Sequence, residues 1–258
     1  MDYYIIDTFT DVCFHGNPAG VCLLEKPISQ RTMQQIAFEN RLPETAFVYR
    51  KEEAYALRWF TPLNVIDLCG HATLAAAYVI FHDVAPEIPR ITFETISGML
   101  VAERKETLYE LTFPIKAPSK LSEPRRLGRH LNIKILEAYS DRDLYLVLGS
   151  QEAVAQYVPD YDKLSMLEDW LGVVITAEGR EADFVSRYFC PELKEEDPVT
   201  GSAHCSLVPI WNQKLGKNTF IAKQLSQRSG ILFCALEEDC VKIAGNATLY
   251  FKGKILCP

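Results

Sequence analysis

The sequence repeats itself at a nearly constant spacing. Residues 58–62 (RWFTP) are matched by residues 187–191 (RYFCP), residues 69–72 (CGHA) by residues 200–203 (TGSA), and residues 97–100 (SGML) by residues 229–232 (SGIL). The paired segments lie 129, 131 and 132 residues apart and occur in the same order. Repeated segments at one spacing are typical of a chain built from copies of one structural unit. The sequence therefore predicts a duplicated domain.

Each half has the same predicted order of elements. Short β-rich runs at residues 4–6, 21–24, 46–49 and 57–60 are separated by turn residues. Residues 71–81 are then Ala-rich, apolar on all sides and free of Gly and Pro, which indicates a buried helix. The second such helix is expected from about residue 202 to residue 215, kinked at Pro209. We expect an α+β protein of two pseudo-symmetric halves, each a curved β-sheet or barrel around a central helix.

One peripheral helix brings the chain to a candidate catalytic acid. Ser29 is placed to cap a helix over residues 30–39, with Ile28 and Met33 as a hydrophobic staple. This helix leads to Glu44 at the start of the next strand. The proline-rich segment 114–124 predicts the passage between the two halves.

The composition excludes several classes of function. A formal net charge of −7 argues against nucleic-acid binding, and the basic segment 125–130 is explained as well by a solvated surface turn as by an anion site. The apolar run 72–81 is too short to span a membrane, and the first residues do not resemble an export signal. The eight cysteines form no C-x-x-C pair, so we expect free buried thiols in a reducing cytoplasm.

Two glycines open the two predicted central helices. A helix N-terminus carries unpaired backbone N–H groups and partial positive charge, so Gly70 and Gly201, followed by Ser202, are candidate contacts for a small anionic molecule. Glycine at such a position lets a ligand approach the backbone closely. The alternative is that each glycine only makes a strand-to-helix turn, and the paired occurrence favours the binding site.

Two acidic residues are candidates for proton transfer. A base that removes a proton from carbon needs a pKa near the working pH, which partial removal of a carboxylate from water provides. Glu44 lies between Pro43 and the apolar strand 46–48, and Asp197 precedes Pro198 and the second glycine turn. Either residue could instead be an ordinary surface acid.

His71 and Cys69 flank Gly70. The helix dipole should disfavour a charged His71, which predicts a neutral imidazole there, although a core histidine with a purely structural role is an equal alternative. A thiol at a helix N-terminus, such as that of Cys69, could act as a base or nucleophile, but its counterpart Thr200 rules out a symmetric two-thiol mechanism. The other histidines are scattered along the chain, which argues against a metal cluster.

Seven motifs distributed along the chain resemble those of the phenazine-biosynthesis isomerase (PhzF-like) family, which shares its fold with diaminopimelate epimerase. They are residues 7–10 (DTFT), 16–21 (GNPAGV), 44–48 (ETAFV), 58–62 (RWFTP), 67–73 (DLCGHAT), 196–203 (EDPVTGSA) and the turn at 229–230. The combination of GHAT and EDPxTGSA at this spacing is highly specific.

The resemblance implies a diaminopimelate epimerase-like fold in which the last strand returns to the first half. The N-terminal half would comprise residues 1–117 plus 247–258 and the C-terminal half residues 118–246. It also implies an isomerase without a cofactor or metal, often a homodimer, in which Glu44 withdraws a proton from one carbon and returns it to another. The family's substrate-binding His and Asp fall on His71 and Asp197, and its backbone anion contacts on Gly70, Gly201 and Ser202.

Two departures from the family pattern leave other functions open. Pro43 replaces the serine that precedes the catalytic Glu in the phenazine enzyme, and Cys69 occupies the position of a catalytic thiol in diaminopimelate epimerase. Both argue against the phenazine-pathway substrate but not against the reaction class. Because racemase-fold dehydratases pair a Cys with a Thr, Cys69 and Thr200 also fit an epimerase or dehydratase of an amino or hydroxy acid. The third alternative is a family member that binds a metabolite without catalysis.

Overall fold

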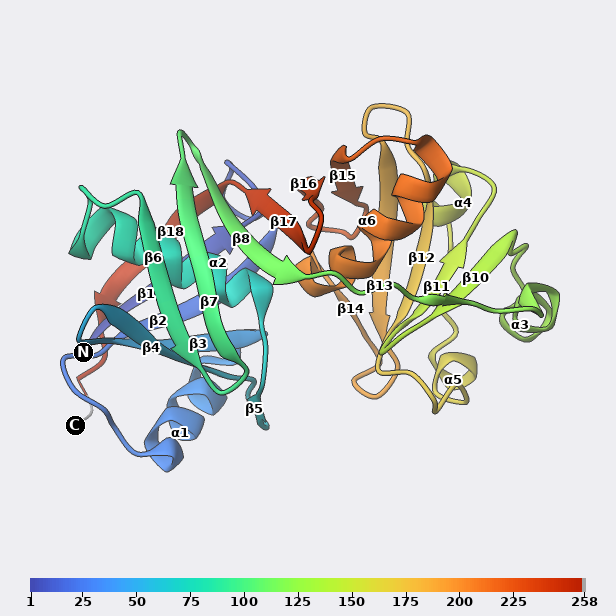
Figure 1. Cartoon of the computed structure of the whole chain (residues 1–258). Helices are drawn as coiled ribbons and strands as arrows, with labels where there is room; N and C mark the ends of the chain where they lie inside the picture. Colours follow the sequence, from blue (N-terminus) through green and yellow to red (C-terminus); the bar gives the residue numbers. More distant parts are fainter. Residues whose placement is uncertain (257–258) are drawn as a thin grey trace. The chain divides into compact units, whose positions relative to one another are not determined.

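The computed structural model describes residues 1–256, which form two compact units. Unit 1 contains Met1–Phe113 and the C-terminal segment from Ile243, and unit 2 contains Pro114–Lys242 (Figure 1). The boundaries expected from the sequence, after residues 117 and 246, each lie four residues further along the chain. Each unit is therefore described by itself below.

Unit 1 is mostly β-structure. Its strands are β1 (Asp2–Thr8), β2 (Asn17–Leu23), β3 (Glu44–Lys51), β4 (Ala54–Phe60), β5 (Val65–Ile66), β6 (Arg90–Thr95), β7 (Gly98–Lys105), β8 (Leu108–Pro114) and β18 (Ala247–Lys254). Its helices are α1 (Gln30–Asn40), α2 (Gly70–Val79) and the π-helical turn η1 (Ile80–Val84). All four strand segments expected near the start of the chain are present: 4–6, 46–49 and 57–60 lie within longer strands, and 21–24 extends one residue beyond the end of β2.

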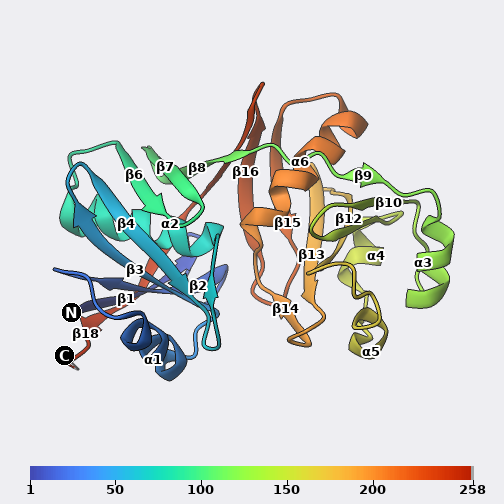
Figure 2. The same ribbon diagram turned by 60° about the horizontal axis from the view of Figure 1, so that its bottom comes forward.

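The strands of unit 1 form one continuous series. β1 pairs antiparallel with both β18 and β2, β2 runs parallel to β3, and β3 is antiparallel to β4. β4 runs parallel to β6 and antiparallel to β5, and β6, β7 and β8 continue as an antiparallel meander. Helix α2 packs against β1, β2, β3 and β18, and Figures 1 and 2 show it among these strands. The series of strands thus wraps one helix.

Helix α2 is buried because its sequence has no polar face. Its Ala-rich segment favours helix, and nine of its ten residues are buried, including Leu74 and Ala75. The predicted helix over residues 71–81 is confirmed. It ends in η1, where the Ala85 N–H donates to Ile80 O over 2.8 Å, and Pro86 then prevents continuation.

The predicted peripheral helix is also confirmed. Ser29 caps α1 by accepting a hydrogen bond from the Thr32 N–H at 3.1 Å. Met33 and Ile36 of α1 are buried in an apolar cluster with Phe47 of β3. These contacts fix the approach of the chain to Glu44, the first residue of β3.

Unit 2 also consists of many short strands and a few helices. Its strands are β9 (Ser119–Lys120), β10 (Glu137–Ser140), β11 (Leu144–Val147), β12 (Val173–Glu178), β13 (Phe184–Cys190), β14 (Glu195–Asp197), β15 (Thr219–Gln224), β16 (Gly230–Leu236) and β17 (Cys240–Gly245), the last of which crosses the unit boundary. Its helices are α3 (Pro124–Leu131), α4 (Gln151–Ala155), α5 (Tyr161–Leu164) and α6 (Gly201–Leu215).

Strand pairing in unit 2 follows a regular order. β10 is antiparallel to β9 and β11, β11 is parallel to β12, and β12 is antiparallel to β13. β13 is antiparallel to β14 and parallel to β15, which is antiparallel to β16. Helix α6 packs against β16. The basic segment 125–130, considered above as a surface turn, instead lies within helix α3.

Helix α6 contains Pro209 in its interior. Proline has no N–H, so it cannot donate to the carbonyl of Cys205 four residues earlier. That carbonyl instead accepts a hydrogen bond from the Lys116 N–H at 3.4 Å. A backbone partner from outside the helix thus offsets the hydrogen bond that the proline removes, and α6 continues without interruption to its C-cap at Gly216.

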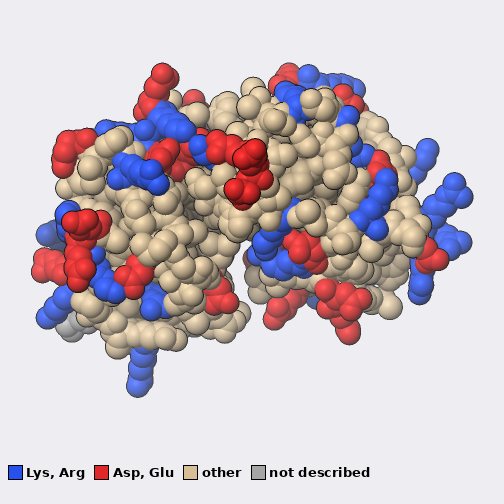
Figure 3. Space-filling view, in the orientation of Figure 1, with Lys and Arg blue, Asp and Glu red and all other residues tan. Residues whose placement is uncertain are grey.

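Two further expectations from the sequence concern membrane-spanning segments and free cysteines. In the described part of the chain no helix is long and apolar enough to cross a membrane. Among residues 1–256 all cysteines are free, and Cys22, Cys69, Cys205 and Cys234 are buried; Cys257 lies outside the described residues. On the face in Figure 3, acidic and basic side chains are interspersed.

Candidate functional site

Glu44 lies at the start of β3, next to the N-terminus of the buried helix. It is the first residue of the strand and pairs with Ala19 of the parallel strand β2. Its carboxylate oxygen Oε2 lies 3.0 Å from Nε2 of His71, and its side chain is 19% exposed. The carboxylate is therefore partly removed from water and held against a second ionisable group.

His71 occupies the first turn of α2 and is almost completely buried. Its Nδ1 atom lies 3.5 Å from Sγ of Cys69 and 3.4 Å from the side-chain nitrogen of Asn17. Burial by itself lowers the pKa of His71, but the neighbouring Cys69 and Glu44 outweigh that effect and raise the pKa well above its usual value. An imidazolium facing a carboxylate is the state these contacts favour.

The prediction of a neutral His71 is wrong. It considered only the partial positive charge of the helix N-terminus, which disfavours a cation. The contacts of His71 with Cys69 and with the Glu44 carboxylate at 3.0 Å act in the opposite direction, and together they raise its pKa. The sequence separation of Glu44 and His71 hides their contact.

Cys69 is the N-cap residue of α2 but makes no side-chain cap hydrogen bond. Burial raises the pKa of its thiol, an effect that the contact with His71 only partly offsets. The backbone of Cys69 is fixed by Thr73, whose Oγ1 and N–H both donate to the Cys69 carbonyl, at 2.5 and 3.1 Å. Burial thus favours the neutral thiol at Cys69, on a backbone that Thr73 holds in place.

In unit 2, Asp197 and Thr200 are joined by a short hydrogen bond in which the Thr200 hydroxyl donates to the Asp197 carboxylate. The buried side chain of Gln224 binds the same turn. Its Nε2 donates to Asp197 O at 2.7 Å and to Thr200 Oγ1 at 3.3 Å, and its Oε1 accepts from the Thr200 N–H at 2.9 Å. Gln224 therefore fixes the turn that opens helix α6.

Ser202, in the first turn of α6, contacts a cation. Its hydroxyl accepts a hydrogen bond from the Arg142 guanidinium at 3.2 Å. Arg142 is also paired with the buried carboxylate of Asp143 at 2.8 Å. Burial alone would lower the pKa of Arg142, but Asp143 outweighs it and raises the pKa. A permanent positive charge therefore lies beside the N-terminus of α6.

The two helix-opening glycines have ordinary backbone conformations. Neither Gly70 nor Gly201 has a positive φ, in contrast to Gly16, Gly98 and Gly216. The turn alone therefore does not demand glycine at these positions. In addition, the N-cap residues Cys69 and Thr200 make no side-chain cap hydrogen bond to their helices. Backbone N–H groups in the first turn of each helix can therefore bind a ligand.

The predicted site residues thus form two groups. Glu44, Cys69, Gly70 and His71 meet in unit 1, and Asp197, Thr200, Gly201 and Ser202 meet in unit 2. Sequence reasoning missed three neighbours, namely Asn17, Arg142 and Gln224. Asn17 belongs to the motif at residues 16–21 and could have been considered, whereas Arg142 and Gln224 carry no local signal.

One group could hold a metal ion. The ligand atoms of Glu44, Cys69 and His71 all lie within 4.8 Å of one another. The scatter of the histidines along the chain indicated no metal cluster, but that reasoning did not consider a mixed set of one carboxylate, one thiol and one imidazole.

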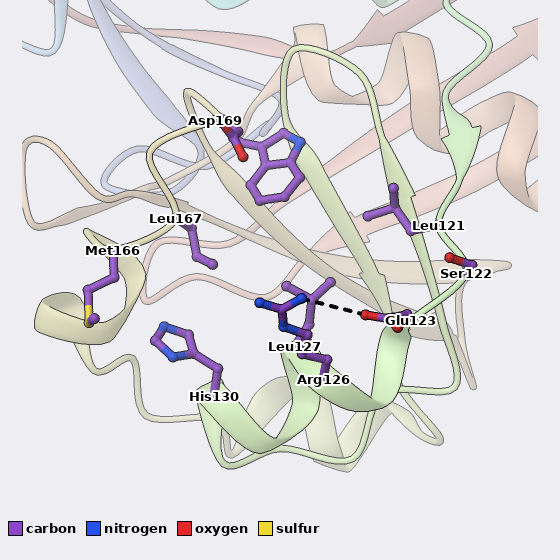
Figure 4. Close-up of a pocket in the computed structure, with 10 residues that line it drawn as sticks. Leu121, Ser122, Glu123, Arg126, Leu127, His130, Met166, Leu167 and Asp169 are labelled. Carbon is purple, nitrogen blue, oxygen red and sulfur yellow. Dashed lines mark ion pairs between the residues drawn. The ribbon is translucent and has the colours of Figure 1, made fainter.

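A separate pocket of about 530 Å³ lies in unit 2 beside α3 (Figure 4). Its lining residues are Leu121, Ser122, Glu123, Arg126, Leu127, His130, Met166, Leu167, Asp169 and Trp170. None is a predicted site residue, and the charged pair that Figure 4 marks, Arg126 and Glu123, is largely exposed. This pocket is unrelated to the chemistry of either group.

Comparison with known proteins defines the class. The fold is a mixed α/β, strand-rich one shared with a hydroxyproline epimerase from Agrobacterium vitis, at a TM-score of 0.65 and 10% identity over 98% of this chain and 91% of that chain. A PhzC/PhzF phenazine biosynthesis protein from Clostridium difficile superposes with a TM-score of 0.96, at 50% identity over 100% of both chains.

The sequence comparisons define the family. Two uncharacterized isomerases of Pseudomonas aeruginosa are 44% and 42% identical to this chain over 99% of its length and 98% of theirs. Residues 6–253 match the PhzC-PhzF family, described as phenazine biosynthesis-like proteins, and the chain belongs to this family. The predicted resemblance and the predicted isomerase class are confirmed.

Proposed function

We propose that the chain is a cofactor-independent isomerase of a small carboxylate-bearing metabolite, and that Glu44 transfers a proton between two carbons of that substrate. The observation that carries the proposal is the placement of the Glu44 carboxylate, mostly buried and 3.0 Å from His71. A carboxylate with a fixed, ionisable neighbour can gain and lose a proton without rearrangement of the site.

The reaction needs one group that both removes and returns the proton. Glu44 would take a proton from one carbon, leaving the electron pair to delocalise into the adjacent π-system of the substrate. It would then deliver a proton to a second carbon on the same face, after the carboxyl proton has had time to exchange in part with solvent. His71 would orient the Glu44 carboxylate throughout, and its N–H groups could hydrogen-bond to developing negative charge.

Unit 2 would recognise the anionic part of the substrate. The open first turn of α6, with Gly201 and Ser202, and the Arg142 guanidinium together favour a carboxylate. That this carboxylate belongs to the molecule on which Glu44 acts is part of the proposal. Its support is the family resemblance of both motifs.

We also propose that the two units descend from one duplicated ancestor. The pairing senses of β1, β2, β3, β4, β6 and β7 recur in the same order in β10, β11, β12, β13, β15 and β16. A helix opened by a glycine follows the short strands β5 and β14 at equivalent points. This order supports the offsets seen in the sequence.

Solvent hydrogen exchange tests the role of Glu44. A panel of small carboxylic acids is incubated with the protein in D₂O and analysed by mass spectrometry and proton NMR. The true substrate gains deuterium with wild-type protein, and Glu44→Gln abolishes this gain while the fold is retained. Glu25→Gln, at an exposed glutamate of unit 1, is the matched control and keeps full exchange. Exchange that persists in Glu44→Gln removes Glu44 from the mechanism.

A second candidate is an epimerase or dehydratase that depends on Cys69. The specific observation in its favour is the 3.5 Å contact between the Cys69 thiol and His71, because a charged imidazole at this distance would stabilise the thiolate. Its raised pKa makes the thiol the weaker candidate. Rapid inactivation by a thiol reagent, lost in Cys69→Ser, would support this function, and full activity of Cys69→Ala would exclude it.

The assembly and location of the protein remain part of the proposal. A homodimer in a reducing cytoplasm is consistent with the family resemblance and with the free thiols among residues 1–256. Light scattering at several protein concentrations would measure the oligomeric state, and a monomer throughout would contradict the dimer.

A further inference from the structure

The side chains of Glu44, Cys69 and His71 offer three different metal-ligand atoms in one place. One carboxylate oxygen, one sulfur and one imidazole nitrogen lie within 4.8 Å of one another. Cys69 and His71 are almost completely buried, and Glu44 is mostly so. Nothing in isomerisation by proton transfer requires this combination, because a carboxylate with an orienting partner is sufficient.

The donor set matches the preferences of Zn²⁺. Zinc binds thiolate, imidazole and carboxylate, with bonds of about 2.3, 2.0 and 2.0 to 2.2 Å, usually in tetrahedral geometry. Such bonds place neighbouring ligand atoms roughly 3.3 to 3.6 Å apart. Oε2 of Glu44 lies 3.0 Å from Nε2 of His71, whereas the 3.5 Å contact of Cys69 Sγ is with the other ring nitrogen, Nδ1. With one ligand atom from each residue, the three donors lie within 4.8 Å of one another, so rotation of the Cys69 side chain toward Nε2 would bring all three to one ion.

The surroundings also suit a metal-bound histidine. A zinc-ligating imidazole normally uses one ring nitrogen for the metal and hydrogen-bonds through the other. If Nε2 of His71, the atom next to Glu44, binds the ion, Nδ1 faces the side-chain amide of Asn17 at 3.4 Å. Rotation of that amide presents an oxygen to an Nδ1–H group. Thr73, through its two hydrogen bonds to the Cys69 carbonyl, holds the third ligand in position.

We infer that Glu44, Cys69 and His71 form a binding site for Zn²⁺, and that occupation of this site inhibits the enzyme. The inhibition rests on the proposed function, because the ion would take the Glu44 oxygen that otherwise receives the substrate proton. Three protein ligands leave the fourth tetrahedral position open to water. On binding, the Cys69 thiol proton and the proton on Nε2 of His71 pass to solvent as the Zn–S and Zn–N bonds form.

Cobalt(II) provides a direct probe of the site. Protein freed of metal with a chelator and kept reduced with a phosphine is titrated with Co²⁺, and thiolate-to-cobalt charge transfer is followed in the near ultraviolet. We expect one Co²⁺ per chain with this band, and loss of the band when Zn²⁺ displaces the cobalt. Cys69→Ser should lack the band, and Glu44→Gln should bind Co²⁺ more weakly than wild type, because it loses one charged ligand oxygen.

The chain supplies a matched control for adventitious binding. Cys13 and His15 have the same Cys-x-His spacing as Cys69 and His71, but they lie on a largely exposed segment. Cys13→Ser should keep the cobalt band unchanged. A band that survives in Cys69→Ser, or that disappears in Cys13→Ser, would overturn the assignment of the site.

The deuterium-exchange assay separates this inference from the proposed function. Zinc should stop exchange into the substrate in wild-type protein, and a chelator should restore it. If zinc binds through Cys69 but leaves exchange unchanged, the inhibition is refuted. If instead Glu44→Gln retains exchange, the proposed proton carrier is wrong, while the cobalt titration still decides whether the metal site exists.

Discussion

Replacement of Gln224 by leucine should destabilise the turn that opens helix α6. The substitution keeps a side chain of similar size but removes three hydrogen bonds to Asp197 and Thr200. The Thr200 N–H and the Asp197 carbonyl are then left without these partners. An unsatisfied buried polar group costs about 1 to 3 kcal/mol. Because Asp197 is only half-buried and water can reach it, we expect a loss of about 2 to 4 kcal/mol in the free energy of unfolding.

Thermal and urea unfolding would measure this loss. For a chain of this size, the expected change corresponds to a decrease in Tm of roughly 4 to 16 °C. Gln213→Leu, on an exposed position of α6, is the matched control and should change stability by less than about 0.5 kcal/mol. The amide proton of Thr200 should also exchange faster with solvent in Gln224→Leu. Equal stability of the two variants would refute the role assigned to Gln224.

Three further changes test the remaining contacts. Contacts with Cys69 and Glu44 raise the pKa of His71 in the folded protein, so protonated His71 stabilises the fold. This stabilisation is complete below the unfolded-state pKa of about 6.5 and is lost as the pH rises through the folded-state pKa. The stability advantage of wild type over Glu44→Gln, from urea unfolding at several pH values, should therefore shrink at alkaline pH; a constant advantage would contradict the ion pair. For the substrate found by deuterium exchange, Arg142→Gln should raise the KM roughly 10- to 100-fold and change kcat less, since a hydrogen bond to a charged group contributes about 1.5 to 3 kcal/mol. An unchanged KM would exclude Arg142 from substrate binding. Thr73→Val removes one of the two hydrogen bonds to the Cys69 carbonyl and keeps the one from the backbone N–H of residue 73. The free energy of unfolding, measured in urea, should therefore fall by only about 0.5 to 1.5 kcal/mol, and a loss above about 3 kcal/mol would contradict this small role for the hydroxyl.

Local sequence patterns predicted the elements that carry the site. The Ser29 cap, the apolar segment 71–81 and the strand that begins near Glu44 each depend on residues close together in the chain. Propensity and periodicity describe such local preferences directly. The central helices and the residues at their N-termini were therefore accessible without a structure.

Contacts between remote residues were not accessible in this way. The prediction of a neutral His71 failed because it considered neither the neighbouring Cys69 nor Glu44, which is 27 residues away in the sequence and meets His71 only through the packing of β3 against α2. Gln224 and Arg142 reach the start of α6 from the end of β15 and from the turn before β11. No periodicity encodes such meetings, because they depend on strand order and register.

The pairing of β1 with β18 has a consequence for biosynthesis and for engineering. The N–H and carbonyl groups of Met1 exchange hydrogen bonds with Ile255, at 3.1 and 3.0 Å, so the two ends of the described chain lie side by side. On the ribosome, unit 2 is complete before its neighbour, which must wait for its final strand to be synthesised. A short peptide joining the ends should permit new termini in an exposed loop, giving a circularly permuted protein that folds in a different order.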